Sequence, residues 1–144
     1  MDDRDDREAT IERELDLRLV LSPDDGATVP ARLRYRTDDP FAVHVSFHIH
    51  SDAPVHWTFA RELLIEGLFR PCGRGDVRVW PTRADGRQVV CLALSSPDGD
   101  ALLEAPAHVV SAWLERTLRA VPTGSEGERL GLEQGLEALL SPES

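Results

Sequence analysis

Three histidines in the middle of the chain have a spacing that could bind a metal ion. His48 and His50 lie two residues apart on a predicted strand, and His56 follows across a turn. Residues two apart on a strand share a face, and imidazole is a common zinc ligand. However, no cysteine or carboxylate is placed to complete a ligand set. We therefore interpret the histidines as part of a polar sheet face, and we predict neither a metal nor another cofactor.

Arginines form a second pattern with possible chemistry. Arg32, Arg34 and Arg36 alternate along one predicted strand, and Arg78 could join them with the aromatic ring of Trp80. Arginines and aromatic residues on a sheet face are typical of single-stranded nucleic-acid binding. The formal net charge of the chain is -10, and phosphate binding needs a local excess of cations. We favour a solvated face whose arginines pair with nearby acids, and nucleic-acid binding is the alternative.

The sequence contains no constellation that is typical of catalysis. All 16 basic residues are arginine, so Schiff-base and P-loop lysine chemistry is excluded. The segment Gly73-Arg74-Gly75 is expected to be a flexible loop, too short to bind a phosphate group, and no GxSxG motif occurs. Cys91 lies inside an apolar run, which favours an inert core thiol over a nucleophile. We predict that the protein is not an enzyme.

One of the three tryptophans, Trp80, is predicted either to lie exposed on the surface or to be covered by a helix. Trp57 and Trp113 fall on apolar faces, whereas Trp80 shares its face with Arg78. An exposed tryptophan beside an arginine is a common anchor of protein interfaces. A short leucine stripe in the last part of the chain is a second apolar candidate. The candidate protein-interaction residues are Trp80, Pro81, Leu132, Leu136 and Leu139.

Alternating and helical periods give the elements that must position these residues. Apolar alternation predicts strands starting at Leu15 and over 29–35, 41–49 and 55–59, followed by a helix over 61–69. Further strands are expected around 77–80, 89–94 and 101–105, and a second amphipathic helix from 107 to 121. The short spacing of the first four strands indicates an antiparallel meander. The predicted fold class is therefore α+β, with antiparallel sheets in two halves, each a run of strands plus a helix.

Charge separates the two ends of the chain from its centre. Residues 1–14 hold seven acids and three arginines, and residues 122–144 hold five acids and one arginine. We expect an acidic disordered arm at 1–12, one domain at 13–121 and an acidic, partly helical tail at 122–144. No run of about 18 apolar residues and no apolar leader segment occurs. We therefore expect a cytoplasmic protein with no membrane span.

Four segments carry a resemblance to a known family. They are FAVHVSFH at 41–48, WTFARELL at 57–64, GRGDVRVWP at 73–81 and VVCLALSSPDG at 89–99. Together, over about residues 13–121, they resemble the SsgA-like sporulation and cell-division regulators of filamentous actinomycetes. The absence of lysine fits the GC-rich genome of such an organism.

The resemblance implies a fold and a function. The implied fold is similar to that of the whirly proteins, with a tendency to form homo-oligomers. The implied role is non-enzymatic: promoting or positioning septum formation during sporulation. The implied partners are the tubulin-like division GTPase FtsZ, its partner proteins and SsgA-family paralogues, and the implied location is the division septum.

Overall fold

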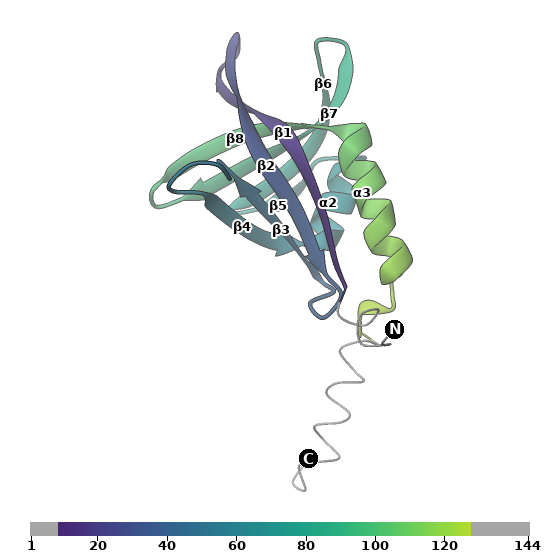
Figure 1. The fold of residues 1–144 in the computed structure, drawn as a ribbon. Coiled ribbons are helices and arrows are strands. Elements are labelled where there is room, and N and C mark those ends of the chain that lie inside the picture. Colours follow the sequence, from purple (N-terminus) through teal and green to yellow (C-terminus); the bar gives the residue numbers. More distant parts are fainter. Residues whose placement is uncertain (1–8, 128–144) are drawn as a thin grey trace, which may run out of the picture.

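The computed structural model describes residues 9–127 of the chain, which contain eight strands and two well-formed helices (Figure 1). The fold class expected from the sequence, α+β with antiparallel strands, is confirmed. The elements are β1 (Thr10–Ser22), β2 (Asp25–Arg36), β3 (Ala42–Phe47), β4 (Val55–Ala60), α2 (Arg61–Gly67), β5 (Cys72–Arg74), β6 (Val77–Ala84), β7 (Arg87–Ser96), β8 (Gly99–Pro106) and α3 (Ala107–Ala120).

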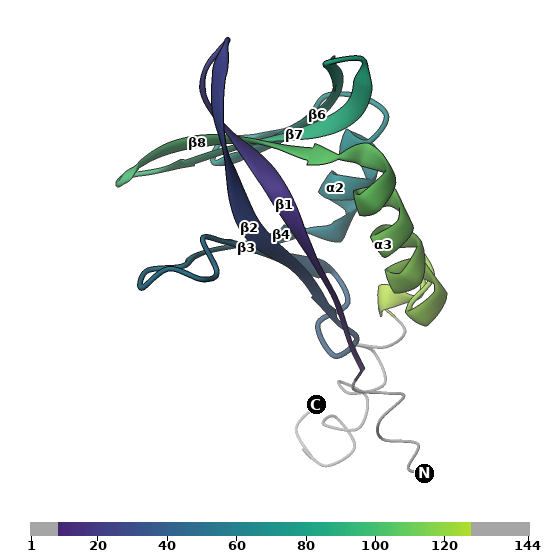
Figure 2. The same cartoon turned by 45° about the horizontal axis from the view of Figure 1, so that its top comes forward.

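All eight strands belong to one antiparallel sheet with the order β4-β3-β2-β1-β8-β7-β6-β5. Each predicted half is a four-stranded meander, and the first and last strands join the two halves. The β1–β8 junction contains only two residue pairs, Arg18 with Glu104 and Leu19 with Leu103. The sheet therefore turns sharply there. Figure 2 shows the half-sheets crossing, with α2 between them and α3 beside it.

The core lies between the inner faces of the two half-sheets. The alternation that predicted the strands sets this face, because side chains two apart on a strand point the same way. Trp113 of α3 is 1% exposed, and α3 packs against β1, β7 and β8. The inner strand positions that are buried are Leu17, Val29, Ala31, Leu33, Tyr35, Val43, Val45, Phe47, Phe59, Val79, Val90, Leu92, Leu94, Leu103 and Ala105.

The first strand begins earlier than its apolar pattern predicts. Residues 10–12 were expected in a disordered arm, but Thr10 pairs with Arg36 and Glu12 pairs with Arg34. Backbone pairing with β2 holds this segment, and Ile11, between the polar residues Thr10 and Glu12, packs against the core. Its free edge is covered by α3, because Trp113 Nε1 donates to the Ile11 carbonyl at 3.1 Å and Arg116 Nη1 to the Glu12 carbonyl at 3.4 Å.

Two further expectations are corrected by the structure. Phe41 was expected on the apolar face of the third strand, but it precedes β3 and is 50% exposed. The segment Gly73-Arg74-Gly75 was expected as a flexible loop, yet Gly73 and Arg74 belong to β5, which pairs with β6. Gly75 supplies the turn with a φ of 74°.

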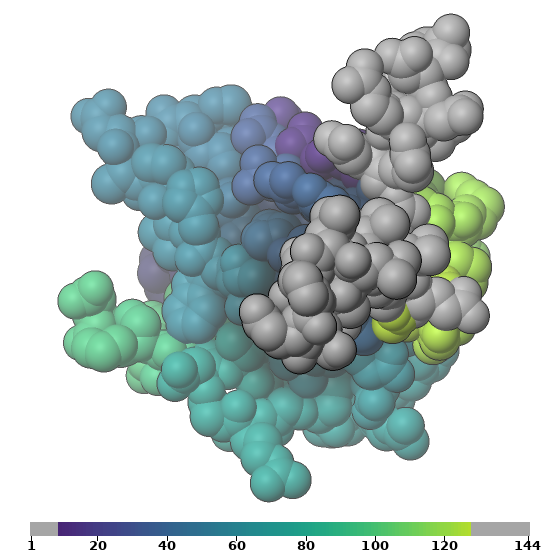
Figure 3. Space-filling model, turned by 90° about the horizontal axis from the view of Figure 1, so that it is seen from below, coloured from purple at the N-terminus to yellow at the C-terminus, as the bar shows by residue number. Residues whose placement is uncertain are grey.

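Figure 3, viewed from below, shows the ends of the β3–β4 and β7–β8 hairpins projecting on one side and the end of α3 on the other.

A buried arginine joins the two helices to the segment that follows α3. Arg61, the first residue of α2, is 1% exposed. Its Nη1 donates to the Thr117 carbonyl at 3.1 Å, and its Nη2 donates to Glu126 Oε2 at 2.8 Å. The guanidinium lies 4.9 Å from the centre of the Tyr35 ring, which adds a cation–π contact. The start of the predicted tail is therefore fixed to the domain.

This contact makes a testable prediction about pH. Burial alone would raise the pKa of Glu126, but hydrogen bonds from Arg61 and from backbone N–H groups, with the Arg61 charge, hold that pKa below its ordinary value of 4.5. A carboxyl with a lowered folded-state pKa stabilises the fold above its unfolded pKa, and this stability is lost as pH falls through the folded pKa. We expect Glu126→Gln to be less stable than the native chain near pH 6, and the difference to shrink below pH 4.5. Urea denaturation at pH 6 and pH 3.5 measures both differences.

The matched control for this prediction is Glu62→Gln, because Glu62 is exposed on α2. Its effect on the free energy of unfolding should be small at both pH values. A difference for Glu126→Gln that stays constant between pH 6 and pH 3.5 would contradict the lowered pKa.

Candidate protein-interaction surface

Trp80 lies on the outer face of the sheet, away from the helices. It is partly exposed, and it stands opposite Cys91 in the β6–β7 ladder. Cys91 stands opposite Glu104 of β8, which stands opposite Arg18 of β1. Because residues paired across an antiparallel sheet share a face, these four side chains form one row. The expected outward orientation of Trp80 therefore agrees with the strand register.

The rows on either side of Trp80 are mainly apolar and partly exposed. Val89 and Pro106 are paired on one side, and Ala93 and Leu102 are paired on the other. The inner face of the same strands carries the core residues, against which both helices pack. We call this partly apolar surface the outer β6–β8 face. Its residues are Arg78, Trp80, Val89, Ala93, Leu102 and Pro106.

Pro81 does not belong to this face. It is paired with Val90, which is 0% exposed, so it lies on the core side of β6. The sequence grouped Trp80 with Pro81 because they are adjacent, but adjacent strand residues point to opposite faces. Pro81 also lacks a backbone N–H, which limits pairing by another chain along this part of β6, where β5 has already ended.

A cleft of about 830 Å³ adjoins the outer β6–β8 face. It lies between the β1–β2 and β6–β7 hairpins, whose ends project in the same direction in Figure 1. The ion pair of Arg18 with Glu104 lies in it, with Nη1 and Oε1 3.2 Å apart. The polar residues that line the cleft include Asp16, Arg18, Thr28, Arg87, Glu104 and His108. The sequence analysis missed this cleft, because its walls come from strands that are distant in sequence.

The cysteine next to Trp80 is not activated. Burial, with a smaller contribution from the Glu104 charge, raises the pKa of Cys91 to about 11. The thiol is therefore protonated at neutral pH and is a poor nucleophile.

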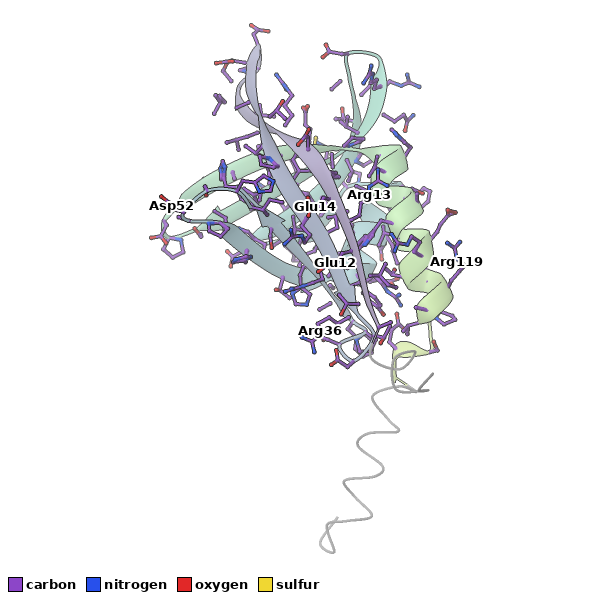
Figure 4. The ribbon with its side chains drawn as sticks, in the orientation of Figure 1. Glu12, Arg13, Glu14, Arg36, Asp52 and Arg119 are labelled. Carbon is purple, nitrogen blue, oxygen red and sulfur yellow. The ribbon has the colours of Figure 1, made fainter. Side chains whose placement is uncertain are left out.

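The arginine stripe is on the outer face of the other half-sheet, and its charges are largely matched. Arg32 Nη2 donates to Glu14 Oε2 at 2.8 Å, and this hydrogen bond, with the Arg32 charge, lowers the pKa of Glu14. Arg36 donates to both carboxylate oxygens of Asp38, at 3.0 and 2.7 Å. Arg34 stands opposite Glu12 in the ladder. Figure 4 shows Glu12 and Glu14 on β1 and Arg36 near the end of β2.

Arg78 does not join that stripe. It lies on β6, and three strands, β1, β8 and β7, separate β6 from β2 in the sheet. The matched acids and this separation mean that the four predicted arginines, Arg32, Arg34, Arg36 and Arg78, do not form one continuous cationic track.

The histidines also have separate neighbours. His56 Nδ1 is 2.7 Å from Ser46 Oγ, and His44 Nδ1 is 2.9 Å from Thr58 Oγ1. His48 lies beyond the end of β3, with a φ of 57°. No group of three metal-ligating side chains occurs within residues 9–127. The leucine stripe Leu132, Leu136 and Leu139 lies outside the described residues.

Comparison with known proteins identifies the family. Residues 29–126 match the family model for SsgA, described as a Streptomyces sporulation and cell division protein. This match covers more than half of the chain. The chain belongs to the SsgA family.

Relatives in the SsgA family match over nearly the whole chain. The sporulation-specific cell division protein SsgB of Streptomyces coelicolor is 54% identical over 132 residues, which cover 92% of this chain and 96% of the relative. The SsgB protein of Frankia casuarinae is 46% identical over 134 residues, which cover 93% of this chain and 94% of the relative. The resemblance found in the sequence is therefore confirmed.

Solved structures in the SsgA family have the same fold. One comes from a study of SsgB mutations that correlate with longitudinal cell division during sporulation of Streptomyces coelicolor. It has a TM-score of 0.82 and 55% identity, and the match covers 85% of this chain and 97% of that chain. The other is an SsgA-like sporulation-specific cell division protein from Thermobifida fusca, with a TM-score of 0.82 and 38% identity. The match covers 91% of this chain and 96% of that chain.

Membership in the SsgA family supports a role in sporulation-specific cell division, and the family description names a cellular role rather than a reaction. No helix within the described part of the chain is long and apolar enough to cross a membrane.

Proposed function

We propose that this SsgA-family protein promotes or positions septum formation during sporulation by binding the division machinery. The partner is FtsZ or a protein that associates with it, including SsgA-family paralogues, and the protein acts at the septum as a folded homo-oligomer. The observation that carries the proposal is the outer β6–β8 face, where Trp80 is partly exposed among other apolar side chains, opposite the face on which the two described helices pack. A tryptophan in such a setting is a frequent centre of binding energy.

Co-sedimentation with polymerised FtsZ from the same organism tests the proposal directly. We expect the purified protein to pellet with FtsZ in the presence of GTP, in proportion to the polymer. If the protein stays in the supernatant, a pull-down with SsgA-family paralogues tests the indirect route. Failure of both experiments would overturn the proposal.

Trp80→Ala tests the surface. We expect it to weaken partner binding by about 30-fold, since truncating a central interface tryptophan costs about 2 kcal/mol or more. The fold should be retained, because Trp80 lies on the outer face. Titration of the pelleted fraction gives the dissociation constant, and a thermal melt checks the fold.

Phe41→Ala is the matched control, because Phe41 is an exposed aromatic residue just before β3, in the other half of the domain. It should leave partner binding unchanged. Equal losses for the two variants would show that the outer β6–β8 face has no special role.

A further inference from the structure

The strand β4 forms one end of the sheet, and no described strand pairs with its outer edge. It pairs with β3 through all six of its residues, from Val55 to Ala60, without a register shift. Natural sheets protect such edges with short strands, charged side chains, prolines or bulges. The other end of the sheet is protected in this way, because β5 has only three residues and β6 then contains Pro81. The sequence of β4, VHWTFA, contains no acid, arginine, proline or glycine.

The register shows which backbone groups of β4 face this free edge. The N–H of Arg61 donates to the Phe41 carbonyl at 2.7 Å, one position beyond the last residue pair of β3 and β4. Hydrogen-bonded and non-bonded pairs alternate along an antiparallel ladder. The odd-numbered residues of β4 therefore bond to β3, whereas the N–H and C=O groups of His56 and Thr58 point away from it. An extended backbone of another chain would complete the hydrogen bonds of both residues.

The two faces of β4 differ in chemistry. Trp57 points inward and is only partly buried against the core, so the inward side chains of an added strand would lie beside its ring. A tryptophan in such a position is a frequent centre of binding energy. His56 points outward and is exposed. Ser46 Oγ lies 2.7 Å from its Nδ1, so a hydroxyl that donates there leaves the Nε2–H to donate to a carboxylate.

The outward face near this edge lacks acids on its strands. Neither β3 nor β4 contains a carboxylate, and Glu12 and Glu14 of β1 lie on the far side of β2 (Figure 4). Arg34 of β2 is exposed, and neither it nor His56 has a carboxylate within 4.0 Å among the described residues.

Two acids lie beyond the middle of the edge. The Oδ2 atom of Asp39 is 3.6 Å from His44 Nε2, and Asp52 lies in the β3–β4 connection. The middle of the edge, around His56, therefore favours a carboxylate over a cation.

We propose that the free edge of β4 binds an extended segment of a partner protein as an added antiparallel strand, with apolar side chains beside Trp57 and a carboxylate beside His56. The backbone ladder supplies affinity, and the two faces select the segment. A second copy of this chain fits less well, because its own β4 carries no carboxylate. This edge is separate from the outer β6–β8 face, and the proposal does not rest on the proposed function.

Selection from a library of random octapeptides, with the full native chain as the bait, tests the proposal. We expect the enriched peptides to alternate apolar and polar residues and to carry aspartate or glutamate among the polar ones. Changing these acids to lysine in a synthetic copy should weaken binding, measured by fluorescence anisotropy. Methylating alternate backbone nitrogens should weaken binding by about tenfold in one of the two registers and hardly in the other, because only alternate N–H groups of an added strand bond to β4.

Thr58→Pro removes one N–H group from the free edge of β4, and we expect it to weaken binding of the same peptide by about tenfold. Proline is tolerated on an edge strand where its missing N–H is not bonded within the sheet, and a thermal melt checks the fold. Thr58→Val is the matched control. Both variants lose the hydroxyl that lies 2.9 Å from His44 Nδ1, but valine keeps the N–H, so binding should be unchanged.

Three results would overturn the proposal. They are a selection that enriches no alternating acidic peptide, peptide binding that survives Thr58→Pro, and equal effects of methylation in both registers. Loss of self-association in Thr58→Pro, measured by analytical ultracentrifugation, would also overturn it, because the edge would then bind a second copy. If Thr58→Pro fails to fold, the methylated peptides on the native chain still decide between the outcomes.

Discussion

Replacing Arg61 with methionine is expected to lower the free energy of unfolding by about 3–5 kcal/mol, the usual cost of removing one partner of a buried ion pair. The carboxylate of Glu126, 10% exposed, would lose its cation, and the Thr117 carbonyl would lose its side-chain donor. The cation–π contact with Tyr35 would also disappear. Methionine fills a similar space, so the loss measures polar contacts more than cavity formation.

Urea denaturation followed by circular dichroism measures this effect. Arg70→Met is the matched control, because Arg70 makes one solvent-exposed ion pair with Glu66, and we expect it to cost at most about 0.5 kcal/mol. In the double variant Arg61→Met with Glu126→Met, no charge is left unpaired, so the double loss should be smaller than the sum of the single losses. Equal costs for Arg61→Met and Arg70→Met would show that the buried arginine does not hold α2 to α3 and to the segment after it.

The sequence predicted the local elements because their signals are local. The alternation in residues 29–35 indicates which side chains face the core, and the structure buries Leu33 and Tyr35 as expected. The run 89–94 is apolar throughout, so it predicted a strand but not which of its side chains face the core. Local alternation could not predict how the two meanders join. This junction depends on two residue pairs between β1 and β8, whose members are 84 or more residues apart in the sequence.

The candidate surface likewise has features that local sequence patterns predict and features that depend on residues distant in the sequence. Strand alternation placed Trp80 and Arg78 on one face of their strand, but it did not decide between an exposed ring and one covered by a helix. The strand register of the structure decides this, and it also gives the paired rows around Trp80. The burial of Arg61 was not predictable, because arginine is rarely buried and its partners Thr117 and Glu126 lie far along the chain. The exposure of Phe69 did leave a signal. It lies five residues after buried Leu64, about 140° around the helix, so a helical projection places it on the outer side.

Gly67→Ala is expected to be the second strongly destabilising change. Gly67 is the last residue of α2 and packs directly on β6, where an added Cβ would overlap the Val79 side chain at its Cγ1 and Cβ atoms. Val79 is 0% exposed, and it cannot move without disturbing the core. Forcing extra volume into a packed core costs about 1–3 kcal/mol. The better helix propensity of alanine returns at most about 1 kcal/mol, so the net effect is a loss.

Gly127→Ala is the control that separates crowding from backbone effects. A Cβ at Gly127 meets no atom of residues 9–127 within 4 Å, and its φ is not in the left-handed region. We therefore expect a change in the free energy of unfolding close to zero for this variant and a clear loss for Gly67→Ala, both measured by urea denaturation. The helix α2 connects β4 of one meander to β5 of the other. If α2 were pushed away from β6, the packing that fixes the angle between the two half-sheets would therefore also be weakened. A Gly67→Ala protein as stable as the native chain would mean that α2 can shift freely against β6, and the close packing inferred between the two half-sheets would then be wrong.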